Sequence, residues 1–305
     1  MIRDDDVLCL GPHGFHRMHY TDWGNPASPR VVICAHGLTR NGRDFDFLAR
    51  ALERDFRVVC PDVAGRGRSE WLYRKEDYSY PQYLTDLNAL IARVTAWPAP
   101  LHWLGKLANF LTRRYGSRSL YWVGTSMGGM LGMMLASRPK SPIRRLIVND
   151  VGPFIPKESL ARIAAYVGKD PRFKSLAEVE AYMREISAPF GPLTDAQWHH
   201  LALHSSKQYE DGSWGLRYDP GIALPFRQGP PQDVDLWSYW DTIACPTLIL
   251  RGAQSDLLLK QTAEEMQKRG PRPHQLIEFE GVGHAPMLMA DDQIKAVRDF
   301  LLAPE

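Results

Sequence analysis

A serine between two glycines stands where the sequence changes from a strand-like run to a helix-like segment. The stretch Gly124-Thr125-Ser126-Met127-Gly128 follows the apolar run 120–123 and precedes the segment 127–137. A serine on a sharp strand-to-helix turn projects its hydroxyl above a sheet, where it can act as a nucleophile. The glycines favour this turn because it leaves little room for side chains beside the serine. The sequence therefore predicts Ser126 as a nucleophile.

A neutral hydroxyl is a weak nucleophile, so it needs a base, an acid that orients the base, and donors for an oxyanion. His284 is the candidate base, in the glycine-rich stretch 281–286 that follows the predicted strand 275–279. In that place it would take the proton of Ser126 and later give it to the leaving group.

Two aspartates are candidates for the orienting acid. Asp256 follows the predicted strand 247–250 and completes the chain order of nucleophile, acid and histidine that one class of hydrolases uses. Asp150 follows the predicted strand 145–149 and is the rival, because a carboxylate from another strand end can reach the same imidazole. We predict Asp256 as the acid, with Asp150 as the alternative.

The tripeptide His36-Gly37-Leu38 follows the first predicted core strand, 31–35. A glycine lets the chain turn sharply and leaves the amide of Leu38 free to face a substrate. Together with the Met127 amide it would form a two-donor oxyanion hole. His36 itself is predicted to hold the loop by hydrogen bonds.

The elements that must position these residues alternate along most of the chain. Apolar runs rich in Val, Ile and Leu predict strands buried on both faces, and hence a mainly parallel sheet flanked by helices. These runs are 31–35, 57–60, 120–123, 145–149, 247–250 and 275–279, and helices are predicted at 45–54 and 176–186. The segment 13–22 is predicted as an antiparallel edge strand.

Between about residues 152 and 240 the alternation stops, and the chain is rich in Pro, Trp, His and Tyr. We predict that 152–240 is a helical cap inserted into a core formed by 1–151 and 241–305. Its aromatic and imidazole side chains are candidates for lining an acyl pocket. They are Trp198, Trp214, Trp237, Trp240, His199 and His200. A second irregular segment, 95–115, is predicted to carry a helix.

Composition narrows the possible partners. The net charge of +2 gives no strong attraction to nucleic acid or to an anionic membrane surface. No apolar run approaches the roughly 20 residues of a membrane-spanning helix, and the charged N-terminus has no apolar signal region behind it. We expect a cytoplasmic monomer or homodimer that acts on a small molecule, without a nucleic-acid or membrane partner.

The sequence predicts no metal site. The four cysteines, Cys9, Cys34, Cys60 and Cys245, are scattered and show no close pairing. The histidines at 13, 16 and 19, and those at 200 and 204, lack the glutamate of a zinc-protease helix. Cys34 and Cys60 lie in strand-like runs and are predicted to be buried thiols.

With these motifs the chain resembles the α/β-hydrolase superfamily over nearly its whole length. The resemblance rests on His36–Leu38, Asp62–Ser69, Gly124–Gly129, Gly252–Asp256 and Gly283-His284. It implies an eight-stranded, mainly parallel sheet, a triad of Ser126, Asp256 and His284, a helical cap and no cofactor. The form is similar to the bacterial esterase and lactonase branch of that superfamily.

The predicted function is cleavage of a carboxylic ester or lactone through an acyl-enzyme on Ser126. Two alternatives would use the same fold. One is a C–C bond hydrolase with the same triad and more charged anchors in its pocket. The other is a ligand receptor that binds a small apolar signal with negligible turnover.

Overall fold

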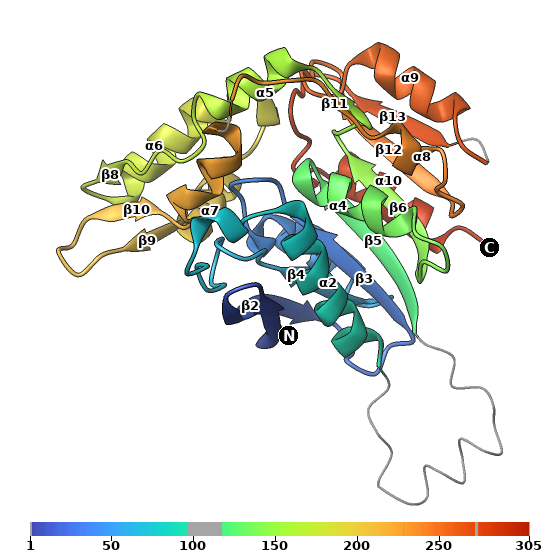
Figure 1. The fold of residues 1–305 in the computed structure, drawn as a ribbon, viewed down its shortest axis with the longest axis horizontal. Helices are drawn as coiled ribbons and strands as arrows, with labels where there is room; N and C mark the ends of the chain where they lie inside the picture. The colour runs from blue at the N-terminus through green and yellow to red at the C-terminus, as the bar shows by residue number, and fades with distance from the viewer. Residues whose placement is uncertain (1, 97–117, 228, 272–273, 305) are drawn as a thin grey trace, which may run out of the picture.

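A twisted eight-stranded sheet forms the centre of the molecule (Figure 1). The computed structural model describes residues 2–96, 118–227, 229–271 and 274–304. In spatial order the strands are β1 (Arg3–Gly11), β2 (Gly14–Trp23), β4 (Arg57–Pro61), β3 (Arg30–Ala35), β5 (Ser119–Thr125), β6 (Ile143–Asn149), β12 (Thr247–Gly252) and β13 (Gln275–Phe279). All neighbouring pairs from β4 to β13 are parallel, whereas β1 and β2 are antiparallel to each other and β2 to β4.

The predicted sheet is confirmed, and each of the six apolar runs lies in one of its strands. The prediction of 13–22 as an edge strand was wrong in one respect. This segment forms β2, which is antiparallel as expected, but β1 lies outside it and is the edge. Strand β1 was not predicted because it begins with acidic residues and has no apolar run. Only its Val7 and Cys9 are buried.

Helices cover both faces of the sheet, because the strand side chains alternate between two apolar clusters. In β3, Val31 and Ile33 belong to one cluster and Val32 and Cys34 to the other. The core helices are α1 (Asp46–Leu52), α2 (Tyr80–Thr95), α4 (Met127–Ala136), α9 (Lys260–Lys268) and α10 (Asp291–Leu302), with the short 3₁₀ turns η1 (Gly42–Phe45) and η2 (Lys75–Asp77). Helices α2, α4 and α9 pack in the first cluster, and α1 and α10 in the second.

Helix α4 lies unusually close to the sheet, and glycine makes this possible. A Cβ atom at Gly128 would stand 2.0 Å from the carbonyl oxygen of Ala35 in β3, and one at Gly124 only 2.2 Å from the carbonyl oxygen of Gly128. These are far below van der Waals contact. The two glycines that flank Ser126 therefore let the first turn of α4 rest directly on the neighbouring strand ends.

The segment between β6 and β12 carries several helices. Most of it lies at the upper left in Figure 1, while its last elements, β11 and α8, lie at the upper right near β12. Its elements are β7 (Phe154–Ile155), α5 (Lys157–Ala164), β8 (Arg172–Phe173), α6 (Leu176–Ile186), η3 (Ala188–Phe190), α7 (Asp195–Ser205), β9 (Ser206–Gln208), β10 (Trp214–Leu216), η4 (Pro220–Arg227), β11 (Val234–Asp235) and α8 (Trp237–Trp240). Strands β8, β10 and β9 form one small sheet, and β11 and β7 another.

Most of the second irregular segment, including its predicted helix, lies outside the described residues. Among the helices that the structure does describe, none is long and apolar enough to span a bilayer. Cys9, Cys34 and Cys60 are buried and unoxidised, as predicted for Cys34 and Cys60.

Candidate active site

Ser126 occupies the turn between β5 and α4 in a conformation that few residues adopt. Its φ of 52° and ψ of −116° lie outside the favoured regions for an L-residue. Its N–H donates to the carbonyl oxygen of Asn149 at 2.9 Å, and its own carbonyl accepts from Gly129 and Met130 in the first turn of α4. The strain is therefore held by contacts on both sides, as is common at functional sites.

His284 reaches Ser126 from the loop that follows β13. Its Nε2 lies 3.0 Å from the Ser126 Oγ. The loop is fixed from two directions, because the N–H of Gly283 donates to the carbonyl oxygen of Pro189 at 2.6 Å and Asn149 Nδ2 donates to the carbonyl of Pro286 at 2.8 Å. The structure thus brings together the two residues that the sequence placed 158 positions apart.

The acid beside the imidazole is Asp150. Its Oδ2 lies 2.7 Å from the Nδ1 of His284 and accepts a second hydrogen bond from Ser255 Oγ at 2.7 Å. Its Oδ1 accepts from the N–H of Gly252 at 2.9 Å, and its side chain is fully buried. Since a carboxylate only accepts, Nδ1 carries the proton and Nε2 is free to accept from the serine hydroxyl.

The prediction of Asp256 as the acid was wrong. Its side chain is 57% exposed and pairs with Arg162, with Oδ2 2.6 Å from the arginine Nε. The end of β12 and the loop after it still contribute to the site, because Gly252 and Ser255 supply two of the donors that hold Asp150. A positive φ of 54° at Asp150 turns its side chain toward the histidine, a feature that the sequence alone did not reveal.

The two backbone amides predicted to hold an oxyanion are those of Met127 and Leu38. Met127 is the first residue of α4, so no helical carbonyl accepts its N–H. The carbonyl of Gly37 accepts from His36 Nδ1 at 2.7 Å and from the N–H of Arg40 at 3.1 Å. The C=O and N–H groups of a trans peptide point in opposite directions. The N–H of Leu38 shares a peptide with the carbonyl of Gly37, so it points away from His36 and from the N–H of Arg40.

His36 is the residue that sets this peptide. It is fully buried, and its Nε2 accepts from the N–H of Val63 at 2.9 Å. Burial lowers the pKa of His36 to about 4, so the ring stays neutral with its proton on Nδ1. The imidazole thereby links the oxyanion loop to the loop after β4, which is the structural role predicted for it.

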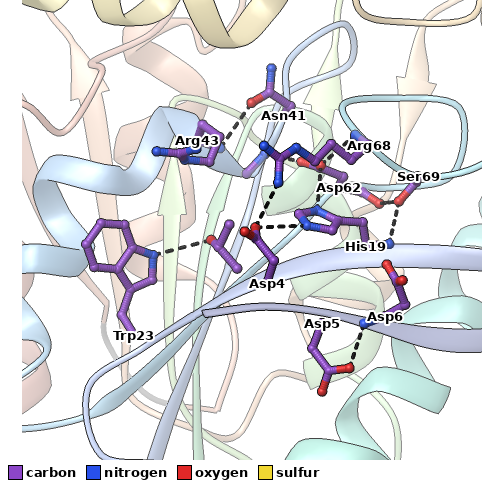
Figure 2. A network of polar contacts seen from close by, with 12 residues as sticks. Asp4, Asp5, Asp6, His19, Trp23, Asn41, Arg43, Asp62, Arg68 and Ser69 are labelled. Atoms are coloured by element: carbon purple, nitrogen blue, oxygen red, sulfur yellow. Dashed lines mark hydrogen bonds and ion pairs between the residues drawn. The ribbon is translucent and has the colours of Figure 1, made fainter. Parts of the chain in front are cut away.

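A polar network anchors the loop after β4 (Figure 2). The buried Asp62 carboxylate accepts from the N–H of Gly42 at 2.7 Å, the N–H of Arg68 at 2.8 Å and His19 Nδ1 at 3.0 Å. Burial by itself raises the pKa of Asp62, but these hydrogen bonds keep it below its ordinary value. Burial disfavours the charged form of His19, yet the carboxylates of Asp62 and Asp4 raise its pKa.

A cavity of about 650 Å³ opens beside Ser126, Leu38 and Met127. Its walls are largely apolar and come both from the core and from the segment 152–240. They include Tyr80, Tyr83, Met130, Ile155, Ile163 and Phe226, and Glu76 carries the one charge among the lining residues of the described chain. The predicted tryptophan lining was wrong: Trp240, for example, is buried and donates from Nε1 to the carbonyl of Met266.

Among the residues that the structure describes, two groups of side chains come close enough to hold a metal ion. Their donor atoms lie within 4.8 Å of one another in Cys9, His16 and Asp86, and in Asp46, His200 and His204. In the first group His16 Nε2 is hydrogen-bonded to Asp86 at 2.9 Å. Neither group borders the cavity beside Ser126.

Comparison with known proteins gives a consistent result. The profile described as the alpha/beta hydrolase family matches residues 32–297. A 3-hydroxybutyrate-oligomer hydrolase from Cupriavidus necator is 47% identical over 302 residues, which cover 96% of each chain.

Solved structures agree in fold over the full length. A structure described as a putative hydrolase from Rickettsia typhi matches with a TM-score of 0.86 at 30% identity and covers 100% of both chains. An alpha/beta hydrolase from Novosphingobium aromaticivorans matches with a TM-score of 0.81 at 34% identity over 99% of both chains.

Exchange of the two aspartates distinguishes their roles. We expect Asp150→Asn to lower kcat about 10⁴-fold, because an amide at this position cannot hold Nδ1 of His284 as the donor. The matched variant Asp256→Asn should keep kcat within about twofold, since it alters only an exposed ion pair. Steady-state ester hydrolysis measures both. Loss of activity in Asp256→Asn with full activity in Asp150→Asn would contradict the assignment.

The low pKa of His36 makes stability depend on pH. Between its unfolded pKa of 6.5 and its folded pKa of about 4, the unfolded chain binds more protons, so stability falls as the pH falls through this window. Between pH 7.5 and pH 5 we expect a loss of about 2 kcal/mol from this group. In His36→Gln, whose amide can accept and donate at the same places, this loss should vanish.

Urea unfolding of both proteins across this pH range measures the difference. If the difference in free energy of unfolding between wild type and His36→Gln stayed constant from pH 7.5 to pH 5, burial of the neutral His36 ring would not be the cause of the pH dependence.

Proposed function

Because the chain belongs to the alpha/beta hydrolase family and is an ester hydrolase, we propose that it cleaves short oligomers of 3-hydroxybutyrate through an acyl-enzyme on Ser126. The observation that carries this proposal is the hydrogen-bonded chain Ser126–His284–Asp150 beside an apolar cavity. The substrate class is supported by the 47% identity with a 3-hydroxybutyrate-oligomer hydrolase along 96% of both chains.

Acylation begins when the Ser126 Oγ attacks the ester carbonyl carbon while Nε2 of His284 takes its proton. The carbonyl oxygen becomes an oxyanion and accepts from the N–H groups of Leu38 and Met127. Asp150 stays ionised and stabilises the imidazolium. The C–O bond then breaks, and the departing hydroxyl receives the proton from His284.

Deacylation repeats these steps with water in place of the serine hydroxyl. His284 takes a proton from the water, whose oxygen attacks the acyl carbon, and the same two amides hold the second oxyanion. Collapse of this intermediate returns the proton to Ser126 and releases the acid. No cofactor enters either half of the reaction.

The cavity favours an uncharged acyl group. Its lining is mostly hydrocarbon and tyrosine, and Glu76 adds a negative charge. In an oligomer of 3-hydroxybutyrate the hydroxyl end is neutral and the carboxyl end is anionic. The hydroxyl end therefore enters the cavity, and the fragment with the carboxylate departs. In liquid water each non-hydrogen atom occupies about 30 Å³. If the same volume is assigned to each non-hydrogen atom of the substrate, the cavity holds roughly three 3-hydroxybutyrate units.

The segment 152–240 acts in this proposal as the cap over the acyl group. Ile155, Ile163 and Phe226 come from it and line the cavity together with Tyr80 and Tyr83 of α2. The cavity gives less support to the C–C hydrolase alternative, because such a pocket needs several charged anchors and Glu76 is the one charged group that the described lining contains.

Replacement of the nucleophile tests the reaction. We expect Ser126→Ala to lower kcat for the 3-hydroxybutyrate dimer by about 10⁴-fold or more, because nucleophile, base and acid act as a unit. Ser137→Ala, whose hydroxyl only bonds to the carbonyl of Met134 at the end of α4, should behave as wild type. Monomer release is followed by chromatography, and a fluorophosphonate should label wild type but not Ser126→Ala.

Prompt labelling of wild type without turnover of the dimer or of any simple ester would contradict a hydrolase and favour a receptor. Turnover of simple esters without turnover of the dimer would contradict only the substrate class.

The charge of the acyl group tests the assignment of the cavity. Compared with p-nitrophenyl butyrate, the mono-p-nitrophenyl ester of succinate should show a kcat/KM lower by about 100-fold or more, because its carboxylate must leave water for an apolar wall. Glu76→Gln should reduce the difference in kcat/KM between the two esters, because it removes a negative charge that repels the succinyl carboxylate. Release of p-nitrophenol measures both. Equal kcat/KM for the two esters would contradict the proposed acyl pocket.

A further inference from the structure

A buried arginine lies directly behind the candidate oxyanion hole. Arg66 stands between Gly65 and Gly67 in the loop after β4, and none of its surface is exposed. The two glycines have φ values of 81° and 56°, which glycine adopts without strain. A Cβ at Gly67 would lie 2.2 Å from the carboxyl carbon of Asp62. This tight loop carries the arginine side chain into the interior.

The guanidinium contacts both residues whose amides would hold the oxyanion. Its Nε donates to the carbonyl oxygen of Leu38 at 2.9 Å, and its Nη2 lies 3.8 Å from the Sδ of Met127. Its Nη1 donates to the carbonyl of Ala64 at 2.7 Å and to the hydroxyl of Tyr83 at 2.9 Å. The group is thereby fixed on both sides of the hole.

All of these partners are neutral. The ion pairs of the described chain include none with Arg66, and its guanidinium carbon lies 4.9 Å from the ring centre of Tyr83 and 5.8 Å from that of Tyr78. The acids near this loop have other cations: Asp62 pairs with His19, and Asp219, which accepts from the Tyr78 hydroxyl, pairs with Lys75. Arg66 therefore leaves a positive charge in a region of low dielectric.

A buried cation without an acid beside it is costly, and a negative charge that forms nearby offsets part of this cost. The oxyanion of the tetrahedral intermediate is such a charge, and it is absent from the bound ester. An interaction that strengthens only when this charge forms lowers the activation barrier of the chemical step. It therefore raises kcat and leaves KM unchanged.

We propose that Arg66 is a positioning residue for the oxyanion hole, which holds Leu38 by its carbonyl oxygen and Met127 by its sulfur and favours the oxyanion through its unpaired charge. The inference rests on the proposed function, because it requires the oxyanion of ester cleavage. Arg66 touches neither substrate nor Ser126 and acts through the two residues that do.

The test distinguishes an effect of Arg66 on formation of the oxyanion from an effect on binding of the ester. In Arg66→Met we expect kcat for p-nitrophenyl butyrate to fall about 100-fold, comparable to the loss of one oxyanion donor, while KM stays within about threefold. The affinity for butaneboronic acid should fall in parallel. Its boron accepts the Ser126 Oγ while His284 takes the proton, which gives an anionic tetrahedral adduct. Arg66→Lys keeps the charge but loses the forked geometry, so its kcat and boronate affinity should fall about tenfold.

Arg68→Met is the matched control. It removes a positive charge two residues along the same loop, but this side chain is half exposed and pairs with Asp4, so kcat and boronate affinity should match those of wild type. Thermal unfolding verifies that each variant folds. If Arg66→Met does not fold, Arg66→Lys decides by the same two measurements.

Boronate affinity in a folded Arg66 variant equal to that of wild type would overturn the inference, as would a rise in KM that accounts for the whole loss of kcat/KM. Both outcomes leave the proposed function intact. A wild-type protein that neither hydrolyses the ester nor binds the boronate would instead overturn the proposed function.

Discussion

The hydrogen bonds to the buried Asp150 carboxylate hold the site together. A fully buried carboxylate is costly unless donors replace the water it has lost. Three do so here: Nδ1 of His284, Oγ of Ser255 and the N–H of Gly252. They come from the loop after β13, the loop after β12 and the last residue of β12, while Asp150 itself follows β6. One charge thus fixes three strand ends relative to one another, and the imidazole is oriented as part of that arrangement.

The other half of the site depends on backbone geometry. The direction of the Leu38 N–H is set by the carbonyl of Gly37, which belongs to the same peptide and is held by His36. His36 is in turn fixed by Val63, in the loop that Asp62 anchors to Gly42 and His19. The orientation of the Gly37–Leu38 peptide therefore depends on buried residues in the loop after β4.

The strands, and the approach of His284 to Ser126, could be predicted from the sequence because each depends on local pattern. Apolar runs buried on both faces identify the parallel strands, and the glycines around Ser126 identify the turn. The choice between Asp256 and Asp150 depended on the direction of a side chain after a positive φ and on an ion pair with Arg162, and both are tertiary features. The edge strand β1 was missed because its acidic residues gave no apolar run.

The residues that line the cavity could not be predicted from local sequence pattern either. Tryptophans that looked suited to a pocket in fact pack within the protein, and the lining comes from Tyr80 and Tyr83 of α2 and from Phe226 of η4. Which aromatic residue faces a cavity depends on how two distant segments pack. Arg66 shows the same limit, because the glycines of the loop indicate a turn but do not reveal that its first arginine is fully buried.

The origin of the cavity walls has a consequence for divergence among related enzymes. Ser126, Asp150 and His284 all stand on loops of the sheet, whereas Ile155, Ile163 and Phe226 belong to the inserted segment. Substitutions in that insertion can therefore enlarge, narrow or recharge the chamber while the proton-transfer machinery keeps its geometry. Selectivity and bond cleavage can evolve at separate positions, and the hydrogen bond between Pro189 and Gly283 marks one point where the two remain physically joined.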